Sequence, residues 1–225
     1  MTRPVFRGVR AVLFDLDGTL LDSAPDLAAA ANVLRRDAGL DDLPLSHYRP
    51  FVGTGARGML RIALGLQPDM PEFELRREEF FQAYEGLLMQ HSGLFAGVPQ
   101  LVQGLEQQGR PWGIVTNKSE RFTLPIARQE ATLGRAAVVV CGDTTPHAKP
   151  HPAPLLHACE RLGILPEHAI YVGDDERDMQ AARAAGMRGV AADYGYLGGV
   201  DSTAGWNPDA AIKNPLELLK LLGMD

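Results

Sequence analysis

The stretch LFDLDGTLLDS, which begins at Leu13, places three aspartates in one short segment directly after an apolar run. The carboxylates of Asp15, Asp17 and Asp22 would repel one another, and burial would add to that cost, unless a positive group lies between them. A calcium-binding EF-hand loop needs Gly at its sixth position, whereas here the Gly is fourth, counted from Asp15. The Gly-Lys-Ser/Thr of a phosphate-binding P-loop is also absent. An Asp-Gly turn is the remaining alternative to a functional site.

Short apolar runs recur along the chain, and polar residues follow most of them. The runs cover residues 11–14, 112–115, 136–140, 169–172, 189–192 and, more weakly, 210–212. They are nearly all apolar rather than alternating, which is typical of strands buried on both faces of a parallel sheet. Helical patterns lie between them at 98–108, 154–162 and 177–185. This alternation predicts a doubly wound, Rossmann-like α/β fold, with ligands bound beyond the carboxyl ends of the strands.

The segment from residue 21 to 91 breaks this rhythm. It contains helical patterns at 25–38, 55–65 and 72–89 and no convincing strand. It is too long for a plain connection between two elements. We therefore predict an α/β core made of residues 1–20 and 92–225, with residues 21–91 inserted after the first strand as a helical cap.

Size and charge exclude several classes of protein. The 225 residues are 45% hydrophobic, which is enough for a sizeable core, and the formal net charge is −6. Such a charge does not attract nucleic acid or an anionic membrane. The sequence has no signal-peptide pattern and no apolar run of membrane-spanning length, so we expect a cytoplasmic protein. Cys141 and Cys159 lack metal-ligand spacing and are expected to be reduced thiols.

Four motifs in a fixed order resemble the haloacid dehalogenase superfamily and, within it, the phosphoglycolate phosphatases. The stretches that carry the resemblance are VLFDLDGTLLDSAPDLAAA, VTNK, KPHPAPLL, YVGDDERDMQAARAAGM and YGY. Any one of them is a weak signal, but the set is highly specific and spans essentially the full chain. The resemblance implies an Mg²⁺-dependent phosphatase that acts on a small phosphorylated metabolite, with 2-phosphoglycolate as the best match, and it matches the helical insert after the first motif.

The residue types suit hydrolysis through an aspartyl-phosphate. Asp15 is the expected nucleophile, because a covalent intermediate divides one difficult step into two easier ones. Asp17 can protonate the leaving oxygen and later deprotonate water. The resemblance implies that Mg²⁺ is held by the Asp15 carboxylate, the Asp17 carbonyl and the Asp174 carboxylate, and hard oxygen ligands suit this ion.

The remaining core motifs supply phosphate binding and support. Lys149 is expected to anchor the nucleophile and the phosphate, with a surface lysine as the alternative. Thr116 and Asn117 can donate to phosphate oxygens, and their alternative is a helix N-cap near Arg121. Asp178 is expected to support the metal ligands or their neighbouring loop without binding the ion itself. Asp175 either has the same supporting role or only caps a helix.

The cap should select the substrate, because the core recognises only phosphate. The distinctive cap loop is PFVGTGARGML, with Gly53, Thr54, Gly55 and Arg57 as candidate specificity residues. Glycines permit close backbone approach, and Arg57 could bind an anionic leaving group such as a carboxylate. The alternative for Arg57 is a solvated helix arginine. Arg49 is a weaker candidate. Asp22 and Asp26 are expected at the start of the first cap helix.

Single residues argue for or against several alternative functions. A dehalogenase of this superfamily lacks the second aspartate of the first motif, but Asp17 is present. A phosphonatase would use a cap lysine, and no lysine lies between Asp22 and His91. A sugar phosphomutase usually has an acidic residue where Gly173 stands, and a non-catalytic protein would be expected to have lost a catalytic carboxylate. The N-acetylmuramic acid 6-phosphate phosphatases are the stronger rival, because HSGLF and NPLELL resemble them as well.

Overall fold

A six-stranded parallel sheet forms the centre of the protein. The computed structural model describes residues 6–224, and in this range the strand order is β5-β4-β1-β6-β7-β8. The strands are β1 (Ala11–Phe14), β4 (Trp112–Val115), β5 (Val138–Val140), β6 (Ala169–Gly173), β7 (Arg188–Ala192) and β8 (Ala210–Ile212). The predicted doubly wound fold is confirmed. The third predicted strand begins at Val138 rather than Ala136, because Ala136 is the C-cap of a 3₁₀-helix at Leu133–Arg135.

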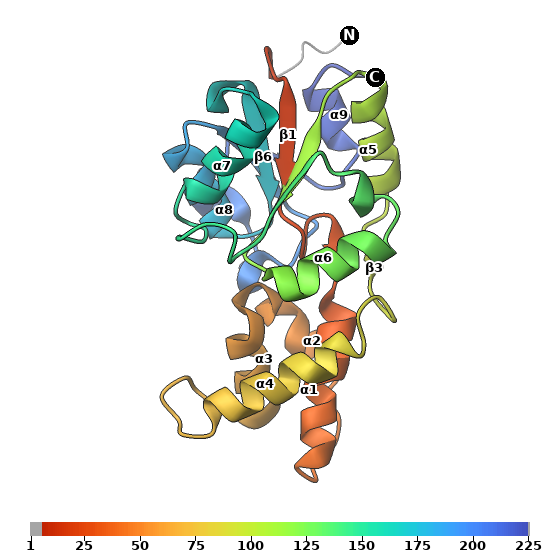
Figure 1. Ribbon diagram of the computed structural model, residues 1–225, viewed down its shortest axis with the longest axis vertical. Helices are drawn as coiled ribbons and strands as arrows, with labels where there is room; N and C mark the ends of the chain where they lie inside the picture. Colours follow the sequence, from red (N-terminus) through yellow and green to blue (C-terminus); the bar gives the residue numbers. More distant parts are fainter. Residues whose placement is uncertain (1–5, 225) are drawn as a thin grey trace.

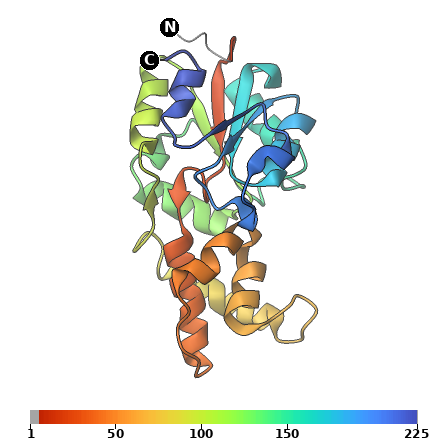
Figure 2. The same cartoon turned by 180° about the vertical axis from the view of Figure 1, so that it is seen from behind.

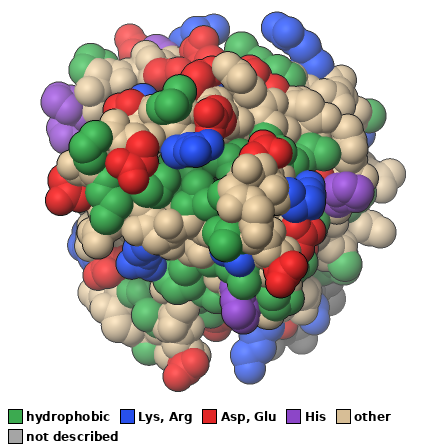
Figure 3. Space-filling view, turned by 90° about the horizontal axis from the view of Figure 1, so that it is seen from below, with side chains coloured by type: hydrophobic (Ala, Val, Ile, Leu, Met, Phe, Trp, Pro, Cys, Tyr) green, Lys and Arg blue, Asp and Glu red, His purple; other side chains and the backbone are tan. Residues whose placement is uncertain are grey.

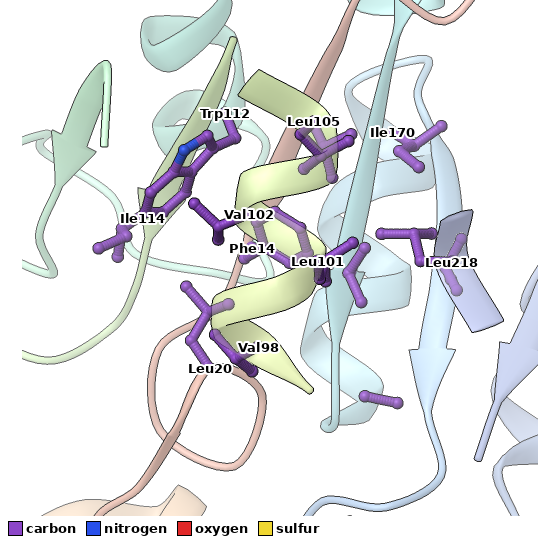
Figure 4. Packing of buried hydrophobic residues seen from close by; sticks show 14 of the residues in the cluster. Phe14, Leu20, Val98, Leu101, Val102, Leu105, Trp112, Ile114, Ile170 and Leu218 are labelled. Atoms are coloured by element: carbon purple, nitrogen blue, oxygen red, sulfur yellow. The ribbon is translucent and has the colours of Figure 1, made fainter. Parts of the chain in front are cut away.

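Alternate residues of β1 pack against different helix layers. Val12 and Phe14 belong to the cluster beneath α5 (Val98–Gln107) and α9 (Glu217–Leu221). Ala11 and Leu13 face the opposite layer, α7 (Ala153–Leu162) and α8 (Glu176–Ala184). Figure 1 shows these two layers on either side of the sheet, and Figure 4 shows α5 lying over Phe14. Burial on both faces explains why β1 is apolar throughout.

Four helices and a 3₁₀ segment form a second body beyond the carboxyl edge of the sheet (Figures 1 and 2). They are α1 (Ala24–Asp37), α2 (Leu45–Tyr48), the 3₁₀-helix Arg49–Thr54, α3 (Gly55–Leu64) and α4 (Phe73–Glu85), and they share their own apolar cluster. The helix predicted to reach residue 89 ends at Glu85. Gly86 is the C-cap of this helix, and the residues Leu88 and Met89 beyond it pack against the apolar cluster of the core.

Two short strands connect the core to the cap. β2 (Leu21–Asp22) pairs antiparallel with β3 (Gly93–Leu94), with Leu21 opposite Leu94. They lie beside the predicted boundaries of the insert, so the chain enters and leaves the cap through one ribbon. No strand was predicted here, because two residues are too few to show a period.

Helix α6 (Glu120–Gln129) is not among the predicted helical patterns, and it contains Pro125. Its Ile126 belongs to the core cluster and its Phe122 to the cap cluster, so α6 lies in the joint between the two bodies. Seen from the cap end, acidic and basic side chains are interspersed around hydrophobic ones (Figure 3).

Candidate active site

The motif residues meet at the carboxyl edge of the sheet. Asp15 follows β1, Thr116 follows β4 and Asp174 follows β6. From β1 the chain adds β4 and β5 on one side of the sheet and then crosses to β6 on the other side of β1. Such a switch point leaves a crevice above the central strand. A cavity of about 350 Å³ lies there, lined by residues of both bodies.

Lys149 is buried against the first aspartate. Its side chain is 2% exposed, and its ammonium lies 3.0 Å from Asp15 Oδ1 and 2.8 Å from Asp178 Oδ1. It also donates to the Tyr171 hydroxyl, which in turn donates to the Val115 carbonyl. Burial works to lower the pKa of Lys149, but the two carboxylates outweigh it and raise the pKa above its usual value. The lysine is therefore a fixed positive charge, and a surface role is excluded.

Asp174 carries the clearest sign of a cation-binding site. It accepts hydrogen bonds from the Thr19 hydroxyl at 3.1 Å and the Tyr196 amide at 2.8 Å. Burial, together with the charges of Asp15 and Asp178, raises its pKa well above the usual value. Oxygens of these three aspartates lie within 4.8 Å of one another. Hard oxygen donors that repel one another at this distance fit a divalent cation.

Glycines bring the backbone close around Asp174. A Cβ at Gly18 would lie 2.0 Å from Asp174 Oδ2, and a Cβ at Gly195 would lie 2.2 Å from its Cβ. Gly18 also has φ +83°, a conformation that glycine adopts at little cost. The carboxylate is thus confined to one position, as a metal ligand needs. The carboxylate of Asp17 is not part of this cluster of three aspartates. The predicted binding of Mg²⁺ by the Asp17 carbonyl stays a prediction.

The carboxylate of Asp17 is paired with a second lysine. Lys118 Nζ lies 3.1 and 3.0 Å from the two Asp17 oxygens. It also lies 4.8 Å from the centre of the Tyr84 ring, which belongs to cap helix α4. Burial works to lower the pKa of Lys118, but its interactions with Asp17 and Tyr84 outweigh burial and raise the pKa above the usual value. No role was predicted for Lys118, although it stands in the VTNK motif.

Thr116 and Asn117 tie two loops together. The Asn117 side chain donates to the Lys149 carbonyl and accepts from the Lys149 amide, both at 2.9 Å. The Thr116 hydroxyl accepts the Lys118 amide at 3.2 Å. Both residues line the cavity, and the N-cap of α6 is Ser119, so the N-cap alternative is wrong. Their predicted contact with phosphate stays a prediction.

Asp175 caps α8 and holds an arginine toward the cap. Its side chain accepts the Arg177 amide in a capping box completed by Asp178. Its carboxylate binds the Arg177 guanidinium twice, and the same guanidinium donates to the Gly53 carbonyl at 2.6 Å. Burial works to raise the pKa of Asp175, but the hydrogen bonds and the charge of Arg177 outweigh it and leave the pKa below its usual value. The core thus contacts the predicted specificity loop directly.

The cap loop contributes three of its four predicted residues. Gly53, Thr54 and Gly55 line the cavity, whereas Arg57 is exposed and does not line it. Arg49 instead binds Asp22 through two hydrogen bonds of 2.9 Å. Asp26 accepts the His91 amide at 2.7 Å and so binds the chain that leaves the cap. Asp26 lies in the first turn of α1, as predicted, and Ser23 is the N-cap of this helix.

The cap side of the cavity is apolar and aromatic. It is formed by Leu27, Val52, Phe80, Phe81 and Tyr84, with Phe122 from α6. The Phe81 and Phe122 ring centres lie 5.2 Å apart. A ligand with its phosphate at the aspartates would place its other groups against these rings.

An ion-pair cluster joins α6 to the cap beside these rings. Arg121 forms two hydrogen bonds with Glu85 and two with Glu78, at 2.6–2.9 Å. Its guanidinium also lies 5.5 Å from the ring centres of Phe81 and Phe122. We refer to Arg121, Glu78 and Glu85 as the Arg121 cluster.

Comparisons with known proteins agree on one family. A model described as haloacid dehalogenase-like hydrolase matches residues 12–192. Phosphoglycolate phosphatase of Xanthomonas campestris pv. campestris (strain 8004) is 47% identical over 209 residues, which cover 93% of this chain and 94% of the relative. N-acetylmuramic acid 6-phosphate phosphatase of Pseudomonas aeruginosa is 41% identical over 214 residues, which cover 95% of each chain.

A solved structure shares the whole architecture. A protein described as a predicted phosphoglycolate phosphatase from Haemophilus somnus matches with a TM-score of 0.86 and 28% identity, over 96% of this chain and 99% of that one. Within the described residues, no helix combines the length and the apolar character needed to cross a membrane.

Proposed function

Because the chain belongs to the haloacid dehalogenase-like hydrolases and its relatives are phosphatases, we propose that it hydrolyses a small phosphate monoester with Mg²⁺, through an aspartyl-phosphate on Asp15. One observation carries the proposal: Asp15 lies at the cavity between Lys149 and the carboxylate of Asp174. The Asp15 Oδ1 atom is held by the Leu16 amide at 2.7 Å and by Lys149 at 3.0 Å. A carboxylate fixed in this way is pre-organised for attack.

The residues divide the reaction into two steps. In the first, a carboxylate oxygen of Asp15 bonds to phosphorus while Asp17 gives its proton to the departing ester oxygen, and the alcohol leaves. In the second, Asp17 takes a proton from water, the water oxygen bonds to phosphorus, and the bond between phosphorus and Asp15 breaks. Inorganic phosphate leaves, and both aspartates return to their starting states.

Positive charge must offset the phosphate dianion in both steps. Lys149 supplies a fixed charge beside the nucleophile, and the Thr116 hydroxyl and Asn117 lie at the same end of the cavity. Asp15, Asp174 and the Asp17 carbonyl would hold Mg²⁺, with Asp178 behind them. When bound, the ion would neutralise charge on the phosphoryl oxygens.

We propose 2-phosphoglycolate as the first candidate substrate, on the strength of the 47% identical phosphoglycolate phosphatase. Its carboxylate would need a cation on the cap side of the cavity, where Lys118 and Arg177 line the wall. Both of these cations already bind carboxylates of the protein. Arg57, the sequence candidate for this role, is exposed and lies outside the cavity lining.

The aromatic wall favours N-acetylmuramic acid 6-phosphate as a second candidate. The acetyl and lactyl methyl groups of this sugar have apolar surface that would pack against Phe80, Phe81 and Phe122. A volume of about 350 Å³ is also ample for a sugar phosphate. Its 41% identical relative carries that activity in its name.

One experiment tests both levels of the proposal. kcat/KM is measured for the two substrates with Mg²⁺ on one preparation, beside an Asp15→Asn control. We expect turnover in the wild type and none above background in the variant. Mg²⁺-dependent turnover by Asp15→Asn would reject the nucleophile. The ratio of the two kcat/KM values decides between the small anionic substrate and the amino sugar. The predicted cytoplasmic location stays a prediction.

A further inference from the structure

Two lysines with largely buried side chains each pair with a different aspartate of the first motif. The chain has four lysines, and two of them, Lys118 and Lys149, line the cavity. Lys149 binds Asp15 and Asp178, whereas Lys118 forms its ion pair with Asp17. The Lys118 side chain is 7% exposed, and its ammonium contacts both oxygens of its partner. A contact with both oxygens fixes the plane of the carboxylate as well as its position.

The backbone of Lys118 is held from several sides. Its amide donates to the Thr116 hydroxyl, and its carbonyl accepts from the Thr123 hydroxyl and the Gly142 amide. A Cβ at Gly142 would lie 2.2 Å from the Asn117 carbonyl oxygen, so the two loops are in close contact there. The ammonium is therefore presented from a rigid support, which is what a positioning group requires.

The cap closes the other side of this ion pair. Tyr84 is buried, and its ring lies over the Lys118 ammonium at 4.8 Å from ring centre to Nζ. The ring is itself held by Phe122, at 5.1 Å between ring centres. The ring face attracts the cation and keeps water from it, which strengthens the pairing with Asp17.

We propose that Lys118 is a positioning residue for proton transfer by Asp17, an inference that rests on the proposed phosphatase function. When Asp17 gives its proton to the ester oxygen, a negative charge forms on its carboxylate. Lys118 lies where it stabilises that charge and holds the carboxylate for the next step, in which Asp17 takes a proton from water. Lys149 has no such role, because it contacts the nucleophile.

The test separates proton donation from the rest of the reaction. An alkyl phosphate needs a proton on its leaving oxygen, whereas p-nitrophenolate leaves p-nitrophenyl phosphate without one. In Lys118→Met we expect kcat for the alkyl phosphate to fall about 100-fold, the scale of general acid–base catalysis. The pre-steady-state burst of p-nitrophenolate should keep its rate within about tenfold, because that step needs no proton from Asp17.

Matched variants make the result decisive. Lys118→Arg keeps the charge and should recover part of the alkyl phosphate rate, and it supplies the test if Lys118→Met does not fold. Lys220→Met, on the exposed face of α9, should leave both rates unchanged. Asp17→Asn should reproduce the Lys118→Met pattern, and the double variant should be no slower than Asp17→Asn alone, since residues that act as a unit are not additive.

Each contrary outcome has one meaning. Equal losses in the burst and in the alkyl phosphate rate would overturn the inference, because a merely structural role predicts them. A raised KM with unchanged kcat would also overturn it and make Lys118 a substrate-binding residue. Absence of wild-type turnover on both substrates would reject the proposed function itself, and so the two failures are distinguishable.

Discussion

The ammonium of Lys149 lies 3.0 Å from the carboxylate of Asp15, and both side chains are almost withdrawn from solvent. Removing one partner of a buried pair leaves an uncompensated charge, which costs about 3–5 kcal/mol. We expect Lys149→Met to lose about that much unfolding free energy, because Asp15 and Asp178 would then repel each other. Urea unfolding measures this loss, and kcat should fall at least about 100-fold. Unchanged stability would mean that the pair is not buried in solution.

Removing the metal should affect stability as well as activity. Asp15, Asp174 and Asp178 repel one another at short distance, and a bound cation relieves this repulsion. We expect EDTA to abolish turnover and Mg²⁺ to restore it. At a concentration about 100-fold above its Kd, Mg²⁺ should add about 2.7 kcal/mol of stability. Differential scanning calorimetry with and without Mg²⁺ measures the shift in Tm, and Asp174→Asn should reduce it.

Gly195→Ala should damage the metal site without changing a ligand. The new Cβ would lie 2.2 Å from Asp174 Cβ and 2.5 Å from the Gly18 carbonyl oxygen. Overpacking of this kind costs about 1–3 kcal/mol. We expect a higher Mg²⁺ concentration for half-maximal activity. Gly205→Ala is the control, because nothing lies within 4 Å of its Cβ, and an equal effect of both substitutions would contradict the prediction.

The Arg121 cluster should hold the cap against the core. Arg121→Met removes four hydrogen bonds between α6 and α4. We expect a larger radius of gyration in small-angle X-ray scattering, and high salt should enlarge the wild type in the same way, because the pairs are exposed. Arg128→Met, exposed on the same helix, is the matched control. A variant as compact as the wild type would show that the aromatic contacts alone hold the cap.

The same cluster gives the cap contact a pH dependence with a definite sign. Hydrogen bonds from Arg121 lower the pKa of Glu78 and of Glu85 below the usual 4.5. A carboxyl with a lowered pKa in the folded state stabilises it above its usual pKa, and that stabilisation is lost as the pH falls through the lowered value. We therefore expect the scattering radius to rise below about pH 4.5 in the wild type. Arg121→Met should lack this transition.

The apolar runs predicted the strands well because the fold buries β1 and its neighbours on both faces. A strand such as Ala11–Phe14 must then be apolar at every position, which a sequence shows directly. The polar residues after these runs were identified for the same reason, since parallel strands bring their carboxyl ends to one edge. Helical patterns predicted α1, α3 and α4 of the cap, whereas the four-residue α2 was not predicted. The ribbon of β2 and β3 was missed, because each strand has two residues.

Contacts between segments far apart in the chain could not be predicted from the sequence. Lys118 and Asp17 are separated by 101 positions, and no local pattern links them. Arg57 was selected for its charge, but α3 buries Met59, Leu60 and Ala63 and leaves Arg57 exposed. The rotation of α3 about its own axis decides whether Arg57 faces the cavity or solvent, and the packing of the helix sets that rotation. The roles of Tyr84 and Arg177 depend likewise on how the cap sits on the core.

The ribbon of β2 and β3 has an evolutionary consequence. Both ends of the cap leave the core through paired strands, so everything between Asp22 and Gly93 forms one cassette with adjoining ends. Such a cassette can be lengthened, shortened or reshaped while the register of the sheet and the spacing of its aspartates stay as they are. Leaving-group preference and phosphoryl chemistry are therefore free to diverge at separate rates within this family.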